Sequence, residues 1–239
     1  MKLIKLIFQL FIILIFIQFS AACSRCKKGS GDIASIERGV PQFNGVELNG
    51  SFDVHIKKDT VQKVVITADD NILPIIETEV EHGILEIEID DDECLRKSNK
   101  IDVYISMPTL RKVRLNGSGK VTGDGQFTGN ELDVSINGSG NISLNFNVAN
   151  LKSKIDGSGN ITLSGISNIS SHEINGSGRI SAKNTESQTV YAKINGSGNI
   201  SVNAIQTLKV NISGSGKVGY SGNPVTDVTI SGSGKVFKE

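Results

Sequence analysis

The sequence predicts an all-β protein, built as a single-stranded parallel β-helix with coils of about 19 residues. Three observations predict this fold. The triplet Gly-Ser-Gly returns seven times at nearly even spacing from residue 117 onward. Aliphatic residues stand at fixed positions before and after every copy. Gly, Ser, Asn, Ile and Val are plentiful while Trp is absent, a composition typical of short strands joined by tight turns.

The first residues of the chain have the features of a secretory signal. Lys2 and Lys5 precede an apolar run over residues 6–19, and small residues then lead to Cys23. The run is short for a membrane span, which needs about 20 apolar residues. A Cys directly after small residues resembles the lipidation motif of bacterial lipoproteins. We therefore expect a signal peptide over residues 1–22 and a lipidated Cys23, which makes the chain an outer-membrane lipoprotein of the cell envelope. Ordinary secretion and an uncleaved anchor are the alternatives.

A polar, Gly- and Ser-rich stretch follows the expected lipidation site. Residues 23–42 are predicted to form the lipidated Cys and a flexible tether. Lipidation of Cys23 leaves Cys26 and Cys94 as the remaining cysteines. In an exported protein these two could form a disulfide. Because Cys26 lies in the expected tether, we predict two unpaired thiols.

The repeat occupies residues 116–239 and predicts seven regular coils. A fixed period in this range is the sequence signature of a solenoid. The first Gly of each copy is Gly117, Gly138, Gly157, Gly176, Gly196, Gly214 or Gly232. The residue two positions before it is always Leu or Ile, and the residue two positions after the second Gly is always Val or Ile.

Each coil is predicted to contain two strands and two turns. Apolar residues alternate with polar ones over residues 132–136, which lead into one bend, and over residues 142–146, which lead away from it. This period of two indicates strands with one buried face. Gly on both sides of the bend indicates either a positive φ or a narrow edge without room for a Cβ. The variable spacing indicates a second turn that accepts insertions.

The polar positions of the repeat distinguish a β-helix from an antiparallel meander. Asn-Gly is also a strong hairpin signal, so a meander is the alternative. However, the residue before the first Gly is Asn, Asp or Ser in every copy, and the residue after the second Gly is Lys, Arg or Asn. Similar polar residues at the same position of every repeat can form hydrogen-bonded ladders when the coils stack, about 4.8 Å apart. We therefore predict the parallel β-helix.

The region before the repeat is predicted to belong to the same rod. Residues 43–115 lack Gly-Ser-Gly but contain four short alternating runs, separated by turn residues. At a period near 19 they would form about four further, irregular coils. Terminal repeats of a solenoid are often atypical because they cap an open end. A helical turn within residues 71–80 could contribute to such a cap.

The chain resembles a known family. The stretches "NGVELNGSFDVHI", "VVITADDNILPIIETEVEHGILEIEI" and "VYISMPTLRKVRLNGSG", followed by the recurring "INGSG", are similar to the autotransporter-adhesin head GIN domain. The resemblance covers residues 43–239. It implies a right-handed parallel β-helix, commonly carried by exported or lipid-anchored bacterial proteins. It implies no catalytic residues.

Several kinds of chemistry find no support in the sequence. Lys plus Arg and Asp plus Glu both number 25, so no net field indicates nucleic-acid binding. "GSGK" lacks the spacing and the following Ser or Thr of a phosphate-binding loop. The acidic stretch 77–93 could bind Ca²⁺, but its alternation with apolar residues favours a solvated strand face. We expect no metal and no cofactor.

An enzymatic role is the main alternative to a binding role. Polysaccharide lyases and hydrolases also use β-helices, and they need clustered carboxylates or a metal. From residue 116 onward only eight acidic residues occur, and none of them cluster in the sequence. The Ser of each bend is too uniform to be a nucleophile. We therefore expect a non-catalytic module, adhesin-like or structural, with a polysaccharide lyase or hydrolase as the alternative.

The candidate binding surface is a polar ridge along the bends, with a glycan or a protein as its ligand. The ridge residues are Asn116, Ser118, Lys120, Asn137, Ser139, Asn141, Asn175, Ser177, Arg179, Asn195, Ser197 and Asn199.

Self-association is a further expectation, because the last coil, 230–239, shows no evident cap.

Overall fold

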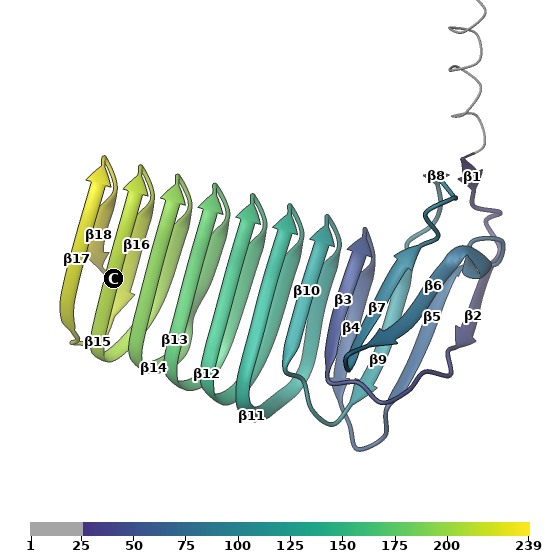
Figure 1. Cartoon of the computed structure of the whole chain (residues 1–239), viewed down its shortest axis with the longest axis horizontal. Coiled ribbons are helices and arrows are strands. Elements are labelled where there is room, and N and C mark those ends of the chain that lie inside the picture. The colour runs from purple at the N-terminus through teal and green to yellow at the C-terminus, as the bar shows by residue number, and fades with distance from the viewer. Residues whose placement is uncertain (1–25) are drawn as a thin grey trace, which may run out of the picture.

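The computed structural model describes residues 26–239 and shows a rod of stacked β-coils (Figure 1). The predicted signal peptide, 1–22, and the predicted lipidation site, Cys23, lie outside the described residues. None of the helices described is long and apolar enough to cross a membrane.

Five long strands form the regular part of the rod. Each strand begins directly after one Gly-Ser-Gly bend and ends in the next, and each pairs in parallel with the strand that follows. The strands are β11 (Lys120–Gly138), β12 (Asn141–Gly157), β13 (Asn160–Gly176), β14 (Arg179–Gly196) and β15 (Asn199–Gly214). The predicted parallel β-helix is therefore confirmed.

Every long strand curves at its middle, at the second turn of the coil (Figure 1). Its first half leaves a bend and its second half approaches the next one, so the rod has two broad faces. We call the face made by the first halves the exit face and the other the approach face. On both faces the inward residues form the core: the Ile two positions before each bend stacks on its equivalent in the next coil, as Ile136 does on Ile155.

The bends require Gly for two different reasons. Gly176, the first Gly of its bend, has a φ of 134°, and a Cβ there would lie 2.4 Å from the carbonyl oxygen of Gly157 in the coil below. Gly178, the second, is buried, and a Cβ there would lie 2.7 Å from the carbonyl oxygen of Gly159. Both explanations predicted from the sequence therefore apply: the first Gly has a positive φ and no room for a Cβ, and the second lacks room for a Cβ.

The first coil in the sequence is not the first coil in space. Strands β3 (Gly45–Gly50) and β4 (Asp53–Lys58) flank an incomplete bend in which Phe52 replaces the second Gly. β3 pairs with β10 (Lys112–Gly117), and β4 pairs with the start of β11. On their other side lie β7 (Ile84–Ile89) and β9 (Asp102–Met107). The coil of residues 45–58 is thus inserted between residues 84–107 and the regular repeat.

The far end of the rod is antiparallel, so the prediction of about four parallel coils in residues 43–115 is wrong. β6 (Ile76–Glu81) forms a hairpin with β7, and β5 (Lys63–Asp69) pairs antiparallel with β9. The hairpin turn contains His82 and Gly83, both at positive φ, and turns of this kind join antiparallel strands. The predicted helical turn is present as the 3₁₀ helix η1 (Leu73–Ile75).

The segment predicted as a tether is largely ordered. β2 (Ile33–Glu37) pairs antiparallel with β5, and β1 (Lys27–Lys28) pairs with β8 (Leu95–Lys97). Cys26 and Cys94 form a disulfide, so the prediction of two unpaired thiols is wrong. The Asp69 carboxylate accepts hydrogen bonds from the backbone N–H groups of Gly31 and Asn99, which fixes both segments to the end of β5.

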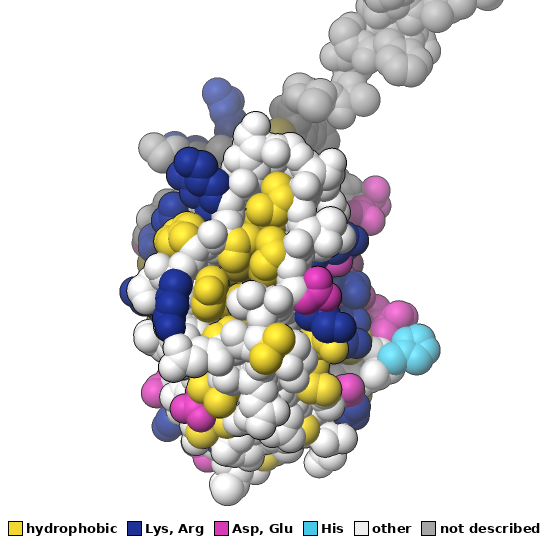
Figure 2. Space-filling view, turned by 90° about the vertical axis from the view of Figure 1, so that its left-hand side faces the viewer, with side chains coloured by type: hydrophobic (Ala, Val, Ile, Leu, Met, Phe, Trp, Pro, Cys, Tyr) yellow, Lys and Arg dark blue, Asp and Glu magenta, His cyan; other side chains and the backbone are white. Residues whose placement is uncertain are grey.

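The opposite end of the rod shows apolar side chains to solvent. It consists of β16 (Lys217–Ser221), β17 (Val225–Gly232) and β18 (Lys235–Lys238). Val228 and Ile230 are each 41% exposed, although their equivalents one coil earlier, Val210 and Ile212, are buried. Figure 2 views this end, where apolar side chains gather within a rim of polar and charged ones. Among residues 26–239, no strand pairs with the outer edge of β17.

Candidate binding surfaces

The predicted polar ridge exists as an in-register array. Every one of its residues is exposed or half-buried. The residues that flank the bends are register partners of their equivalents in adjacent coils, and the Ser residues lie in the bends between them. Part of it is bonded to itself. Nδ2 of Asn175 donates to Oδ1 of Asp156 at 2.7 Å, and Nδ2 of Asn195 donates to Oδ1 of Asn175 at 2.7 Å. The Asn positions therefore cross-link coils as well as facing solvent.

The ridge continues into the incomplete coil that the sequence prediction left out. Asn49 is the register partner of Asn116, whose Nδ2 donates to Oδ1 of Asn49 at 2.7 Å. On the exit face, Lys120 is followed in register by Asp53 and then Asp102. The triplet Asn49-Gly50-Ser51 was the sequence signal that could have identified this eighth bend.

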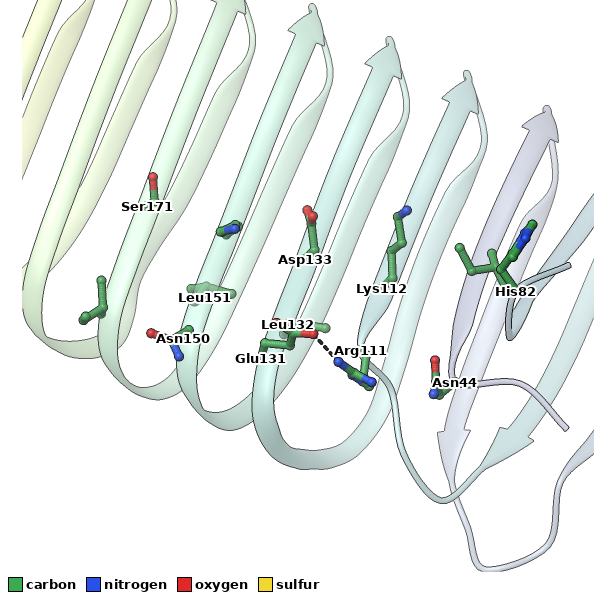
Figure 3. A pocket seen from close by; sticks show the side chains of 13 residues that line it. Asn44, His82, Arg111, Lys112, Glu131, Leu132, Asp133, Asn150, Leu151 and Ser171 are labelled. Atoms are coloured by element: carbon green, nitrogen blue, oxygen red, sulfur yellow. Dashed lines mark hydrogen bonds and ion pairs between the residues drawn. The ribbon is translucent and has the colours of Figure 1, made fainter.

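The approach face carries a groove of about 490 Å³ (Figure 3). Lys112, Asp133, Lys152 and Ser171 are successive register partners along it. At its lower edge Arg111 forms an ion pair with Glu131. Alternating charges on neighbouring strands favour a ligand with both charge signs, such as a peptide segment, over a uniformly charged one.

Carboxylates gather on the approach face near the antiparallel end. Glu47, Glu86 and Glu79 are register neighbours on three adjacent strands, and Arg114 forms an ion pair with Glu47 at 2.9 Å. Burial and the nearby carboxylates of Glu47 and Glu88 raise the pKa of Glu86 above its usual value. Within residues 26–239 no group of His, Cys, Asp and Glu side chains has the arrangement of a metal site. Within the acidic stretch 77–93, the Glu residues up to Glu88 lie on or beside β6 and β7, and residues 90–93 form a turn after β7.

A second cluster lies on the exit face, where sequence reasoning found nothing. The rings of His55 and Tyr104 are stacked, with centroids 4.9 Å apart and planes 16° apart. Nε2 of His55 is 3.4 Å from Oδ1 of Asp102, and its Nδ1 is 3.2 Å from Oγ1 of Thr122. The residues come from three strands, β4, β9 and β11, that are distant in sequence. Only the outward parity of His55 and Tyr104 in their alternating runs indicated exposure.

One histidine is buried in the core. His172 faces inward, and Oγ of Ser153 lies 2.7 Å from its Nδ1. Burial lowers the pKa of His172 from 6.5 to about 4, because a charged imidazole is poorly solvated there. His172 is therefore neutral at physiological pH and has a structural position.

A family model matches most of this chain. The family model described as "Putative auto-transporter adhesin, head GIN domain" matches residues 42–224. Among curated proteins, no sequence matches this chain.

Solved structures share the fold over about nine tenths of this chain. A "putative adhesin" from Bacteroides fragilis NCTC 9343 has a TM-score of 0.85 at 25% identity, over 89% of this chain and 100% of that one. A "putative lipid binding protein" from Parabacteroides distasonis ATCC 8503 has a TM-score of 0.77 at 25% identity, over 90% of this chain and 100% of that one. A "putative adhesin" from the same organism has a TM-score of 0.74 at 25% identity, with the same coverage. Since the family model spans residues 42–224, well over half of the sequence, the chain belongs to the auto-transporter adhesin head GIN domain family.

Proposed function

We propose that the chain is an exported, membrane-anchored binding module that attaches an extended ligand, a glycan or a protein, without chemical conversion. Membership in an adhesin family supports an attachment role. So do the adhesin names of two solved structures with the same fold. In this proposal the polar ridge is the ligand-binding surface.

The observation that carries the proposal is the geometry of the ridge. Its side chains repeat at the spacing of stacked strands, about 4.8 Å, on a backbone held by continuous parallel pairing. A rigid array loses little conformational entropy when a ligand binds. Lys120, Arg179 and the bend Ser residues are exposed and add donors beside the self-bonded Asn residues. Such an array suits a polymer with its own repeat.

The anchor belongs to the same proposal. Cys23 is the proposed lipidation site, and the disulfide of Cys26 lies three residues further on. The antiparallel end of the rod would therefore be held close to the membrane, with β17 and β18 at the distal end. The Parabacteroides protein named as lipid-binding suggests direct lipid contact as another route to the same location.

The test uses residues 24–239, which retain both disulfide cysteines, incubated with bacterial and host polysaccharides and with matrix proteins. Size-exclusion chromatography then follows ligand and protein together. Co-elution with unchanged polymer length supports the proposal, and a variant with Lys120→Ala and Arg179→Ala should co-elute less. Shortened polymer would instead establish a lyase or hydrolase. An absence of co-elution with every ligand would contradict an attachment role.

A second proposed property is end-to-end self-association. The observation that favours it is the exposed apolar surface at the end of the rod where β17 lies (Figure 2). Within the described part of the chain, β17 pairs with β15 alone. Its inward positions continue the columns by which each coil stacks on the next, so a β17 strand of a second copy has matching chemistry. Sedimentation velocity over a range of concentrations should show reversible dimers.

A further inference from the structure

Because the coils repeat, the residue at a given position can be compared with its equivalents in the other coils. One outward column of the exit face carries a hydroxyl in five successive coils. These residues are Thr122, Ser143, Thr162, Ser181 and Ser201. The same column continues to His55 and Tyr104, where it carries aromatic rings instead. Tyr104 is 49% exposed, so packing does not require the ring. Departures from a consistent pattern concentrate at functional sites.

We propose that His55 and Tyr104 form the wall of a saccharide-binding subsite on the exit face. The inference rests on the proposed binding function and names the class of its ligand. The imidazole is held in place, since Asp102 and Thr122 contact its two nitrogens from opposite sides at 3.4 Å and 3.2 Å. The stack with Tyr104 then fixes the phenol ring, so the wall is formed before a ligand arrives.

The rings border a cavity of about 330 Å³. This volume is at the small end of ligand pockets, which span about 300–1,000 Å³, and suits a single sugar unit. Lys57, Asp124 and Ser106 line the cavity beside the rings. A sugar presents C–H groups that pack on apolar and aromatic surface, and hydroxyls that both donate and accept hydrogen bonds. The ammonium of Lys57, the carboxylate of Asp124 and the hydroxyl of Ser106 supply both partners.

The charges of the subsite favour a saccharide over other small ligands. Lys57 and Asp124 are register partners on adjacent strands, so their opposite charges offset each other and give an anion no net attraction. The ammonium of Lys57 also pairs with the carboxylate of Asp59 at 3.7 Å, which adds further negative charge beside the cavity. A purely apolar ligand would take water away from the charges that line the cavity and offer no hydrogen bonds in return, whereas sugar hydroxyls can replace that water. Beyond the rings, the hydroxyl column continues along the rod beside the ridge. A longer saccharide could therefore extend from the subsite over neighbouring coils.

The experiment measures binding of neutral gluco-, manno- and galacto-oligosaccharides to residues 24–239 by isothermal titration calorimetry. Tyr104→Thr installs the residue type that the column carries elsewhere, and His55→Thr does the same at the neighbouring strand. Each should weaken binding by at least about tenfold, the effect expected when an anchoring aromatic is removed. Tyr191→Ala is the matched control, because Tyr191 is 42% exposed on the approach face and should bind like the wild type.

The outcomes separate this inference from the proposed function. If the wild type binds an oligosaccharide and Tyr104→Thr binds it equally well, the subsite is refuted while the attachment role stands. If no saccharide binds but a protein ligand co-elutes, the ligand class is refuted and the attachment role again stands. Lys57→Ala, an exposed change on the same cavity, gives an independent reading should Tyr104→Thr unfold; unchanged affinity in Lys57→Ala would then overturn the subsite.

Discussion

The regular coils and the antiparallel end hold their chain segments by different means. From β10 to β15, residues 112–214, each strand pairs in parallel with the next one in sequence, and a bend of two Gly residues repeats with every coil. In residues 26–107 pairing is out of sequence order and partly antiparallel, and a disulfide joins residues 68 positions apart. Both regions share the buried apolar core. The repeat reuses one kind of contact in every coil, whereas the other end adds individual contacts such as the disulfide. The following predictions test this difference, from the largest effect to the smallest.

The bend Gly residues should be the most sensitive positions of the regular coils. Gly176→Ala combines an unfavourable positive φ with a Cβ 2.4 Å from a backbone oxygen, so we expect a loss of about 4 to 5 kcal/mol. Gly129→Ala is the control, because a Cβ there meets nothing within 4 Å. Urea unfolding followed by circular dichroism measures both. Similar midpoints for the two variants would show that the bends tolerate side chains.

The disulfide should matter most at the antiparallel end. Replacing Cys26 and Cys94 by Ser removes a cross-link over 68 residues, and the chain-entropy relation gives a loss of about 4 kcal/mol. We expect proteolysis of residues 26–37 to precede that of the regular coils, since the segment loses its covalent attachment. Limited proteolysis with mass spectrometry identifies the first cut. A first cut within residues 112–214 would contradict the prediction that the disulfide stabilises mainly the antiparallel end.

The buried His172 should make the regular coils sensitive to acid. The unfolded state binds a proton near pH 6.5, whereas the folded state resists it until about pH 4. Stability from this group is therefore complete above pH 6.5 and falls as the pH drops toward 4, by about 3 kcal/mol.

The comparison variant for this prediction combines His172→Val with Ser153→Ala. Val occupies the equivalent position one coil before Ser153 and two coils after His172, at Val134 and Val210, so the substitution follows the repeat. The variant should lose less stability than the wild type between pH 6.5 and 4. Parallel pH curves for the two proteins would exclude His172 as the source.

The smallest effect on stability is expected at the end of the rod that β16, β17 and β18 form. Val228→Lys changes a side chain that is already 41% exposed, so the free energy of unfolding should change by less than about 1 kcal/mol. The same change places a charge on the edge of β17 and should abolish the proposed self-association. Sedimentation velocity measures whether self-association is lost. Dimers that persist in Val228→Lys would place the contact elsewhere on the molecule.

The sequence by itself determined the period of the coils, the inward columns and the polar ridge. Each of these follows from residues one coil apart, because parallel stacking puts equivalent positions such as Asn175 and Asn195 beside each other. Even the 3₁₀ turn at residues 73–75 could be anticipated, since it is a local feature.

Only the tertiary structure decided which irregular strands meet. Residues 45–58 pair with residues 112–124 across a long insertion, and no local sequence pattern predicts these partner strands. This pairing brings His55 to Thr122, and the pairing of β4 with β9 brings it to Tyr104. Asp69 at the end of β5 holds Gly31 and Asn99, near the two cysteines of the disulfide. Pairing between distant strands depends on the total free energy of competing registers. In a repeat, the same residue pattern in every copy determines how adjacent coils align.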